Sequence, residues 1–326
     1  MLTNSSFLVT GGTGSFGYTF MTHLLKNDVR SITCFSRDED KQHALKMSLS
    51  DDRVKFILGD IRDVDAVNSA LRDIDFVFHA AALKHVPPSE NFPMEFIKTN
   101  ILGSSNLISA ISKSNVKKAV FLSTDKAVAP INAMGMTKAL MEKLVRSSES
   151  SNPSCLTRYG NVIGSRGSVI PQFIRAIREG KEIALTNPKM TRFLMTLDDS
   201  VNLVLHALAN GNSGDLFVQK SPSTTIENLL AALCEMLKIK SPKIQLIGNR
   251  PGEKIHETLL TSEERFFSQE SDQYFHVTRN YGNFSSEQGQ WKDTSLAYSS
   301  DSVKILSVEE LVILLENTHE IQNLMK

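Results

Sequence analysis

Cysteine is scarce in this sequence, and long hydrophobic runs are missing from it. The three cysteines among 326 residues, Cys34, Cys155 and Cys234, lie far apart and outside any CxxC or Cys/His spacing. This pattern argues against a disulfide framework or a zinc site and favours a reducing, cytoplasmic location. The eight histidines also lack metal-ligand spacing, so we expect no metal. No apolar run reaches the length of a membrane span, so we expect no contact with a membrane.

An excess of charge of either sign is also missing. The 36 lysines and arginines are balanced by 36 aspartates and glutamates, so the net charge is zero. A chain without a broad electric field has nothing to draw nucleic acid to its surface. The expected partner is therefore a small polar substrate.

Short apolar runs alternate with segments of helical periodicity through the first half of the chain. This alternation predicts an α/β fold, a Rossmann-type doubly wound parallel sheet with right-handed crossovers. The expected strands are 7–10, 32–35, 54–58, 76–80, 119–122 and 155–159, and the expected helices are 18–26, 66–71, 94–112 and 137–147.

The rhythm of strands and helices divides the chain into two parts. We expect a dinucleotide-binding domain over residues 1–165, joined by 193–218, and a smaller C-terminal substrate-binding lobe over 166–326. The polar stretch 282–301 predicts an arm that crosses to another subunit or latches the pocket, with simple disorder as the alternative. A capping box that begins at Ser307 predicts a terminal helix over 307–322.

Three glycines follow the first expected strand in the string TGGTGSFG. Gly11 permits a tight turn, Gly14 lets the backbone approach a pyrophosphate, and Gly17 allows close packing of the next helix. The N-terminus of that helix offers free N–H donors to an anion. The spacing therefore predicts a dinucleotide site, although an ordinary glycine-rich turn has the same composition.

The end of the second strand distinguishes NADP from NAD. Arg37, with Lys41 one helical turn further on, favours the 2′-phosphate of NADP, whereas the neighbouring Asp38 leaves NAD as the alternative. Asp60 and Ile61 follow the third strand, where they either border the adenine or cap the strand end.

Several longer strings reveal a resemblance to a known family. TGGTGSFG, SRDEDK, GDIRD, HAAALKHVP, KTNILGSSN, STDKAVAPINAMGMTK, RYGNVIGSRGSVIP, MTRF and RPGEK occur in that order between about Thr10 and Lys254. The chain resembles extended short-chain dehydrogenase/reductases, specifically the inverting UDP-N-acetylglucosamine 4,6-dehydratases. It is most similar to the capsule and O-antigen enzymes of the L-FucNAc route, which are of the 4,6-dehydratase/5-epimerase type. The resemblance implies a UDP-sugar substrate, bound NADP and a homo-oligomer, either a dimer or a hexamer.

The catalytic region departs from most of this superfamily at one position. A tyrosine usually stands four residues before the helix lysine, Lys138, but this chain has Met134 there, which cannot exchange a proton. The acid–base work must then move to Thr124, Asp125 and Lys126. The resemblance implies that Lys126 removes the C5 proton of the sugar and that Asp125 protonates the leaving C6 hydroxyl, while Lys138 holds the nicotinamide ribose.

Some of this assignment stays open at the level of sequence. The C4 hydroxyl can lose its proton to Lys126, to Asp125 or to a water held by Thr124. Asp125 and Lys126 reach one pocket only if the strand before them has ended, and a surface ion pair in a loop is the alternative.

The remaining candidates are contacts to the cofactor and to the nucleotide sugar. Lys84 is expected in the sugar pocket, whereas the neighbouring His85 is expected to pack or to hydrogen-bond within its loop. The expected cofactor contacts are Gly11, Thr13, Gly14, Ser15, Phe16, Gly17, Ser36, Arg37, Lys41, Asp60, Ile61, Ala80, Ala81, Ala82, Asn100, Lys138, Tyr159 and Asn161. The expected substrate contacts are Lys84, Asn161, Ser168, Val169, Pro171, Gln172, Arg192, Arg250 and Glu253.

The sequence supports three functions. The first is a UDP-N-acetylglucosamine 4,6-dehydratase, a lyase that could also be a 5-epimerase. The second is a UDP-sugar 4-epimerase, which usually needs the missing tyrosine. The third is a catalytically inactive NADP-binding sensor or scaffold, which Met134 favours and Asp125, Lys126 and Lys138 oppose.

Overall fold

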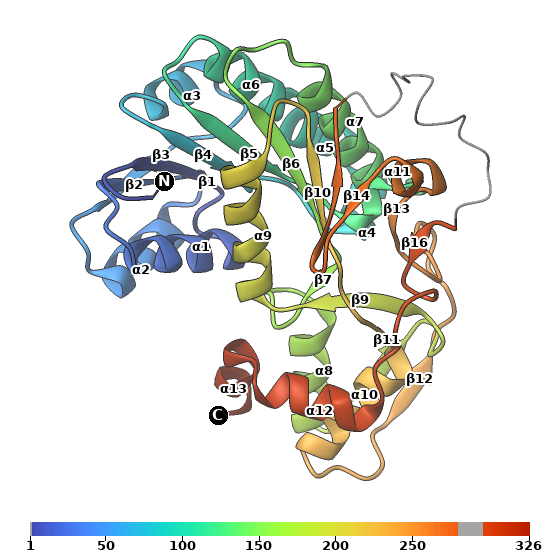
Figure 1. Cartoon of the computed structure of the whole chain (residues 1–326). Coiled ribbons are helices and arrows are strands. Elements are labelled where there is room, and N and C mark those ends of the chain that lie inside the picture. Colours follow the sequence, from blue (N-terminus) through green and yellow to red (C-terminus); the bar gives the residue numbers. More distant parts are fainter. Residues whose placement is uncertain (1, 280–295) are drawn as a thin grey trace.

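A nine-stranded sheet forms the frame of the protein in the computed structural model, which describes residues 2–279 and 296–326. The strand order is β14-β15-β10-β6-β5-β4-β1-β2-β3, and the strands from β3 to β10 run parallel (Figure 1). The bounds are β1 Ser6–Thr10, β2 Ser31–Ser36, β3 Val54–Leu58, β4 Phe76–His79, β5 Lys118–Leu122, β6 Ser154–Arg158, β10 Leu216–Gln219, β14 Gln269–Glu270 and β15 Tyr274–Val277. The six strands expected from the sequence match β1 to β6 within one residue at each end.

Helices cover both faces of this sheet, as a doubly wound fold requires. They are α1 Ser15–Leu25, α2 Glu39–Leu49, α3 Val64–Ala70, α4 Val86–Asn91, α5 Pro93–Phe96, α6 Ser104–Ser112, α7 Ala133–Ser147 and α9 Leu197–Asn210. The predicted Rossmann-type α/β fold class is confirmed.

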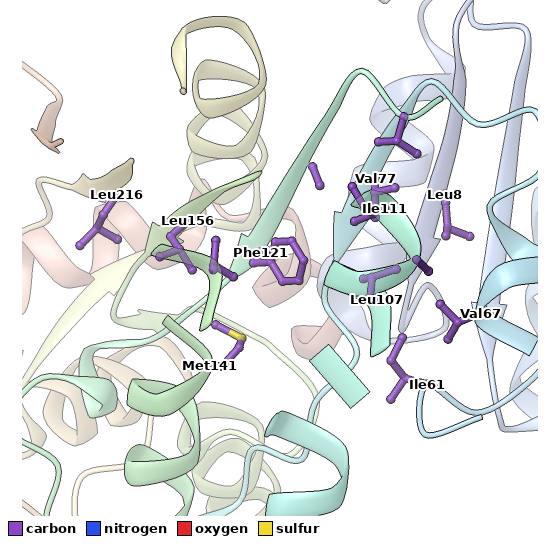
Figure 2. Close-up of a cluster of buried hydrophobic side chains, with 14 of the residues drawn as sticks. Leu8, Ile61, Val67, Val77, Leu107, Ile111, Phe121, Met141, Leu156 and Leu216 are labelled. Carbon is purple, nitrogen blue, oxygen red and sulfur yellow. The ribbon is translucent and has the colours of Figure 1, made fainter. Parts of the chain in front are cut away.

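Successive side chains along each strand point alternately into two separate hydrophobic cores, one on each face of the sheet. Leu8, Val77, Phe121 and Leu156 point to one face, where they pack against residues of α6 and α7 such as Met141 (Figure 2). Their neighbours, among them Phe7, Phe78 and Val120, point to the other face and pack against α1 and α9. Burial on both faces explains why the strands are continuous apolar runs in the sequence.

The helix expected over 94–112 contains a turn of a different kind. Residues Ile97–Gly103 form a π-helix, η1, between α5 and α6. Inside it, Asn100 donates to Leu83 O at 3.0 Å and to Thr137 Oγ1 at 3.0 Å, and accepts from Leu83 N at 2.8 Å. Asn100 thereby ties the segment after β4 to α7.

The second lobe is built on α8 Val169–Arg178, α10 Ile226–Met236 and α12 Val308–Glu316, which enclose a third core. Its remaining elements are β7 Asn161–Val162, β8 Ile183–Leu185, β9 Thr191–Met195, β11 Ser223–Thr225, β12 Ile244–Leu246, β13 Thr258–Leu260, β16 Tyr298–Ser299, α11 Ser262–Phe266 and α13 His319–Met325. The chain crosses between lobes more than once, because α9, β10, β14 and β15 return to the main sheet (Figure 1).

Two expectations for the C-terminal part differ from the structure. The single helix expected over 307–322 is two helices, α12 and α13, since the chain leaves the helical conformation at Thr318. In the expected arm 282–301, residues 282–295 lie outside the described residues. Its end is not free, because Tyr298 is buried and stacks on Phe193 at 5.3 Å.

No helix in residues 2–279 or 296–326 is long and apolar enough to span a bilayer. Within the same residues, no group of three or more His, Cys, Asp or Glu side chains could hold a metal ion.

Candidate functional site

The glycine-rich loop lies between β1 and α1 and packs tightly on its surroundings. Gly11 has a φ of 69°, and a Cβ there would lie 2.8 Å from Ala81 N, so the loop rests on the backbone that follows β4. A Cβ on Gly17 would lie 2.6 Å from Gly12 Cα, which explains the need for glycine where α1 meets the loop. No side chain caps the N-terminus of α1 at Gly14. The N–H groups of this first turn therefore remain available to an anion.

The end of β2 carries a cation without a close partner. The guanidinium of Arg37 is 54% exposed and 3.8 Å from Asp60 Oδ2, while Asp60 pairs more closely with Arg62 at 2.7 Å. Asp38 caps α2 by accepting from Lys41 N, and its carboxylate also pairs with Lys41 Nζ at 2.5 Å. Lys41 is 57% exposed but is engaged by Asp38, so Arg37 is the cation here that lacks a close ion-pair partner.

Other expected cofactor residues around this loop have defined places. Ser36 is buried and accepts from Gln42 Nε2, and Ile61 belongs to the core beneath the loop. Phe16 stacks on Tyr159 with ring centroids 5.7 Å apart. Tyr159 O in turn accepts from Asp125 N at 3.0 Å, which links the glycine-rich loop to the segment after β5.

Asp125 and Lys126 lie on a single 3-10 turn, η2 Asp125–Ala127, that begins after β5 has ended. Thr124 caps the turn, and its hydroxyl donates to Asp125 Oδ1 at 2.8 Å. The turn brings the two charged side chains to the same side, so Lys126 Nζ lies 3.0 Å from Asp125 Oδ1. Since Asp125 is fully buried and Lys126 is 24% exposed, this is not a surface ion pair.

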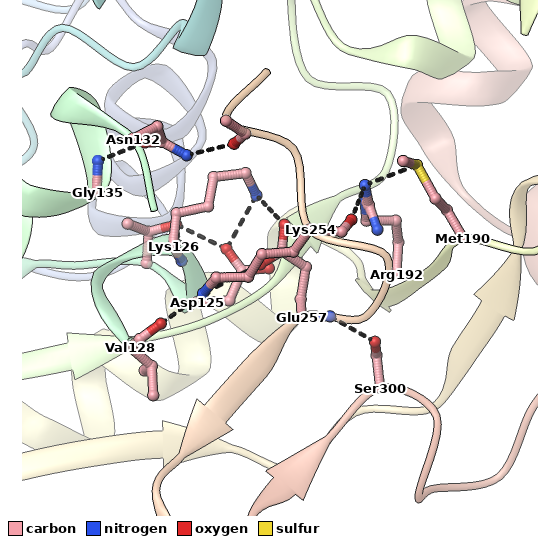
Figure 3. A network of polar contacts seen from close by, with 12 residues as sticks. Asp125, Lys126, Val128, Asn132, Gly135, Met190, Arg192, Lys254, Glu257 and Ser300 are labelled. Atoms are coloured by element: carbon pink, nitrogen blue, oxygen red, sulfur yellow. Dashed lines mark hydrogen bonds and ion pairs between the residues drawn. The ribbon is translucent and has the colours of Figure 1, made fainter. Parts of the chain in front are cut away.

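A second carboxylate reaches the same amine from a distant part of the sequence. Glu257 Oε1 lies 3.6 Å from Lys126 Nζ, and Glu257 Oε2 lies 3.8 Å from Lys254 Nζ (Figure 3). Lys254 also donates to Val128 O next to the turn. The carboxylates outweigh the effect of burial, which by itself lowers the pKa of Lys126, so that pKa lies above its ordinary value. The amine is therefore an ammonium in the free protein.

Arg192 was expected on the substrate phosphates, and the structure gives it other partners. Its guanidinium donates to the backbone carbonyl of Lys254 (Figure 3). It also donates to the carbonyls of Thr191 and Ile255. It thereby holds the segment that carries Lys254 and Glu257. Arg250, the other expected phosphate ligand, is exposed and lies 3.8 Å from Glu253.

Met134 occupies the usual tyrosine position in the first turn of α7 and is buried. A Cβ on the next residue, Gly135, would lie 2.2 Å from Lys126 O, so this turn of α7 lies directly against η2. Lys138, one turn later, donates to Leu122 O at 2.5 Å. Burial lowers the pKa of Lys138 to about 8, although Glu142 opposes the shift.

Several buried polar atoms around the site have no hydrogen-bond partner within the described residues. A buried polar group without a partner costs about 1–3 kcal/mol. Such atoms are retained where a ligand can satisfy them. They include Asp125 Oδ2, Asn161 Oδ1, Ser168 Oγ, Glu253 Oε2 and Glu257 Oε2.

The loop Gly164–Gly167 connects the cofactor side of the site with the expected sugar pocket. Arg166 donates its backbone N–H to Ser15 Oγ at 3.1 Å and its side chain to Thr13 O. Lys84 donates to Arg166 O at 3.0 Å, and His85 packs against Gly167. The loop leads into α8, where Val169 and Pro171 lie in the first turn and Gln172 donates to Gly167 O.

Sequence reasoning missed Glu257, Lys254 and Arg166 as members of this site. Glu257 lies 131 positions after Lys126, counting from the residue numbers, and no spacing connects them. The available signal was the string RPGEK, which drew attention to Glu253 but not to the carboxylate four residues later.

Comparison with known proteins identifies the family. A protein-family model, described as "Polysaccharide biosynthesis protein", matches residues 7–279 of this chain. Two proteins named UDP-glucose 4-epimerase, from Rickettsia akari (strain Hartford) and Rickettsia bellii (strain OSU 85-389), are 47% and 46% identical, and each alignment covers 100% of this chain and 99% of the relative.

Solved structures agree with the observed fold. Pen from Bacillus thuringiensis has a TM-score of 0.91 and 34% identity, with coverage of 98% of this chain and 99% of that one. DesIV, a dTDP-glucose 4,6-dehydratase from Streptomyces venezuelae, has a TM-score of 0.71 and 23% identity, with coverage of 77% and 86%, and it shows likeness of fold alone. This chain belongs to the polysaccharide biosynthesis protein family.

Proposed function

We propose that the protein is a nucleotide-sugar enzyme that removes water from UDP-N-acetylglucosamine, an inverting 4,6-dehydratase with a capacity for 5-epimerisation. The observation that carries this proposal is the ion pair of the fully buried Asp125 with Lys126, on one turn that packs against the helix of Met134. An acid and an amine side by side suit the removal of a proton and a hydroxyl from neighbouring carbons.

The residues of the glycine-rich loop fit a nicotinamide dinucleotide. Gly11 and Gly17 leave no room for a Cβ, and α1 presents an uncapped N-terminus of the kind that holds a pyrophosphate. Arg37 favours NADP over NAD, because its guanidinium is free to meet a 2′-phosphate. When bound, the nicotinamide supplies the reversible hydride transfer on which the reaction depends. Lys138 would hold its ribose.

The elimination step needs two proton transfers, one from C5 of the sugar and one to the C6 hydroxyl, and the protein's own residues supply them. A proton that moves from Lys126 Nζ to Asp125 Oδ1, along their 3.0 Å contact, turns the ion pair into a neutral amine and a carboxylic acid. Burial lowers the free-energy cost of these neutral forms, although the neighbouring carboxylates keep the ion pair as the resting state. The amine then takes the C5 proton of the sugar, and the acid protonates the departing C6 hydroxyl. These two transfers restore the ammonium and the carboxylate, so the pair returns to its resting state. The C4 hydroxyl also releases one proton as it becomes a ketone, and C5 takes up one proton on its opposite face to complete the inverted product, so the protons of the whole reaction balance.

The nucleotide end of the substrate would meet the second lobe. Ser168 and the N-terminus of α8, whose cap has no side-chain hydrogen bond, suit a diphosphate, with Arg250 on the solvent side. Lys84, Asn161 and Glu253 would hold the sugar and the ribose, and two of these residues carry buried oxygens without partners among the described residues. The product would be a 6-deoxy-4-keto UDP-sugar for a bacterial capsule or O-antigen.

UDP-sugar 4-epimerisation is the second candidate, and the names of the Rickettsia relatives favour it. An epimerase returns hydride to C4 and has no use for an acid that expels the C6 hydroxyl. Met134, in the position of the usual proton-exchanging tyrosine, therefore weighs against it.

One assay separates these functions. Purified protein is incubated with UDP-N-acetylglucosamine, and the mass of the product and its C5 configuration are measured. Loss of one water supports dehydration, whereas an isomer of unchanged mass supports epimerisation. Absence of turnover despite bound NADP supports a sensor or scaffold.

Replacing Lys126 tests the assigned base. We expect Lys126→Ala to lower the rate of water loss by at least about 10²-fold, because general acid–base catalysis contributes about 10²–10⁴-fold. NADP binding, measured by fluorescence of the reduced form, serves as the control for folding. Full activity of a folded variant would remove Lys126 from its role.

A further inference from the structure

Glu257 is a buried carboxylate whose side-chain contacts are two ammonium groups. Its side chain is 4% exposed, Oε1 faces Lys126 at 3.6 Å, and Oε2 faces Lys254 at 3.8 Å. Oε2 is also buried without a hydrogen-bond partner among the described residues. Burying a carboxylate costs free energy unless neighbouring cations compensate its charge.

Ser300 fixes the backbone of Glu257 through both its N–H and its carbonyl group, so the position of Glu257 is well defined. Glu257 N donates to Ser300 Oγ at 2.9 Å, and Ser300 N donates to Glu257 O at 2.8 Å. Ser300 Oγ also lies 2.6 Å from Thr191 Oγ1. The carboxylate is therefore held toward the catalytic turn by β9 and by the segment after β16.

Four charged groups face Lys126, and their balance sets its proton affinity. Asp125 of η2 and Glu257 favour the ammonium, whereas Lys254 and Arg192 of β9 oppose it. Asp125 makes the hydrogen bond to the amine at 3.0 Å and so is the partner for proton exchange. Glu257 is further away and acts through its charge.

We propose that Glu257 is a positioning residue that keeps Lys126 protonated in the free protein, so that the proton needed by the Asp125–Lys126 pair is already in place when substrate binds. The inference depends on the proposed function in one respect only, namely that the proton on Lys126 takes part in catalysis. The charge state of Lys126 itself can be measured without substrate.

The test is the reactivity of Lys126 toward a small acylating reagent at pH 8.5, followed by mass spectrometry of the labelled peptides. Only the neutral amine reacts, and its fraction rises tenfold for each unit by which the pKa falls. An opposite charge within about 4–6 Å shifts a pKa by about 1–3 units. We therefore expect labelling of Lys126 in Glu257→Gln to be about 10-fold faster or more, relative to the exposed Lys113.

Two matched variants separate charge from loosening of the fold. Glu257→Asp keeps the negative charge and should label within about threefold of the wild type. Glu253→Gln removes a carboxylate from the same segment that pairs with Arg250, and it should leave Lys126 labelling unchanged. Thermal melting of each variant checks folding.

The results that would overturn the inference are specific. Unchanged labelling in a folded Glu257→Gln variant would show that the carboxylate does not control the amine. Equal acceleration in Glu253→Gln, or in Glu257→Asp, would show that greater access rather than charge is responsible. Neither outcome depends on whether water loss occurs.

Turnover adds a second readout if the proposed dehydration holds. The active pair must carry one proton, so activity falls where Lys126 loses it at high pH. A lower pKa in Glu257→Gln moves this basic limb of the kcat/KM profile to lower pH by about one unit or more. If Glu257 had a purely structural role, its replacement would lower kcat/KM at every pH without shifting the basic limb.

Discussion

At the scale of single residues, the site depends on charges buried close together. Lys126 lies between Asp125 and Glu257, and burial makes each charge in this group act more strongly than it would in water. The position of the usual tyrosine holds the buried thioether of Met134 instead. In the proposed mechanism, proton exchange in this pocket therefore belongs to the residues of η2.

Arg37 allows a test of cofactor choice at the same scale. We expect Arg37→Ala to raise the Kd for NADP by about 10–100-fold, because a charge-assisted contact to phosphate is worth about 1.5–3 kcal/mol. The Kd for NAD should change little. Isothermal titration calorimetry with each cofactor measures the two Kd values. An equal loss of affinity for both cofactors would contradict the assignment.

At the scale of elements, η2 packs against α7, and ion pairs connect α7 to β6 and α11. The first turn of α7 approaches η2 so closely that only glycine fits at Gly135. Below the turn, Arg158 of β6 forms ion pairs with Glu142 of α7 at 2.6 Å and with Glu264 of α11 at 2.9 Å. Ser123 donates to the same Glu142, which connects the end of β5 to this network.

Gly135→Ala tests the contact between α7 and η2. Helix propensity alone would make alanine more stable by about 1 kcal/mol. We expect a loss of about 2 kcal/mol instead, since the new Cβ would lie 2.2 Å from Lys126 O. Denaturant unfolding measures the loss, and the exposed neighbour Met136, changed to alanine, should stay within about 0.5 kcal/mol of the wild type.

Glu264 gives the network a pH dependence. Burial raises the pKa of Glu264, but Arg158 outweighs it and leaves that pKa below its ordinary value of 4.5. The carboxylate therefore stabilises the fold above pH 4.5, and this stability is lost as the pH falls through the lowered pKa.

A variant isolates that contribution. Glu264→Gln should be about 2 kcal/mol less stable than the wild type at pH 7, because a buried charged hydrogen bond is removed. The difference should shrink as the pH falls below 4.5. Chemical denaturation at pH 7, 5 and 3.5 gives the comparison, and a gap that does not depend on pH would contradict the role of the charge.

At the scale of the whole molecule, the site is assembled from both lobes. The main sheet supplies the glycine-rich loop and η2, whereas Arg192, Lys254 and Glu257 come from β9 and the segment before β13. The loop around Arg166 joins the two sides through Ser15 and Thr13. A ligand bound between them should stabilise the protein as a unit.

NADP should therefore raise the melting temperature. At 100 times its Kd, a ligand that binds only the folded state adds about 2.7 kcal/mol. At about 1–2 °C per kcal/mol for a chain of 326 residues, the expected rise is about 3–5 °C. Differential scanning calorimetry with NADP and with NAD at equal concentration measures it. A larger rise with NAD would reverse the proposed cofactor preference.

The amino-acid sequence alone was sufficient to predict the sheet and the place of the turn that carries Asp125 and Lys126. The strands β1 to β6 are buried on both faces, so each appears as an apolar run, and Gly11, Gly14 and Gly17 mark the loop by local geometry. The resemblance of the surrounding string to a known family pointed to Asp125 and Lys126, which lie just beyond such a strand. These features depend on neighbours in the chain, which a sequence displays.

Only the tertiary structure decided which distant groups join that pair. Glu257 meets Lys126 because β13 pairs with β16 and because Ser300 and Arg192 fix the intervening segment. The same folding directs the guanidinium of Arg192 to backbone carbonyls. Charges close in space but far apart in the chain leave no periodic pattern, so their proton affinities can be read only from the folded molecule.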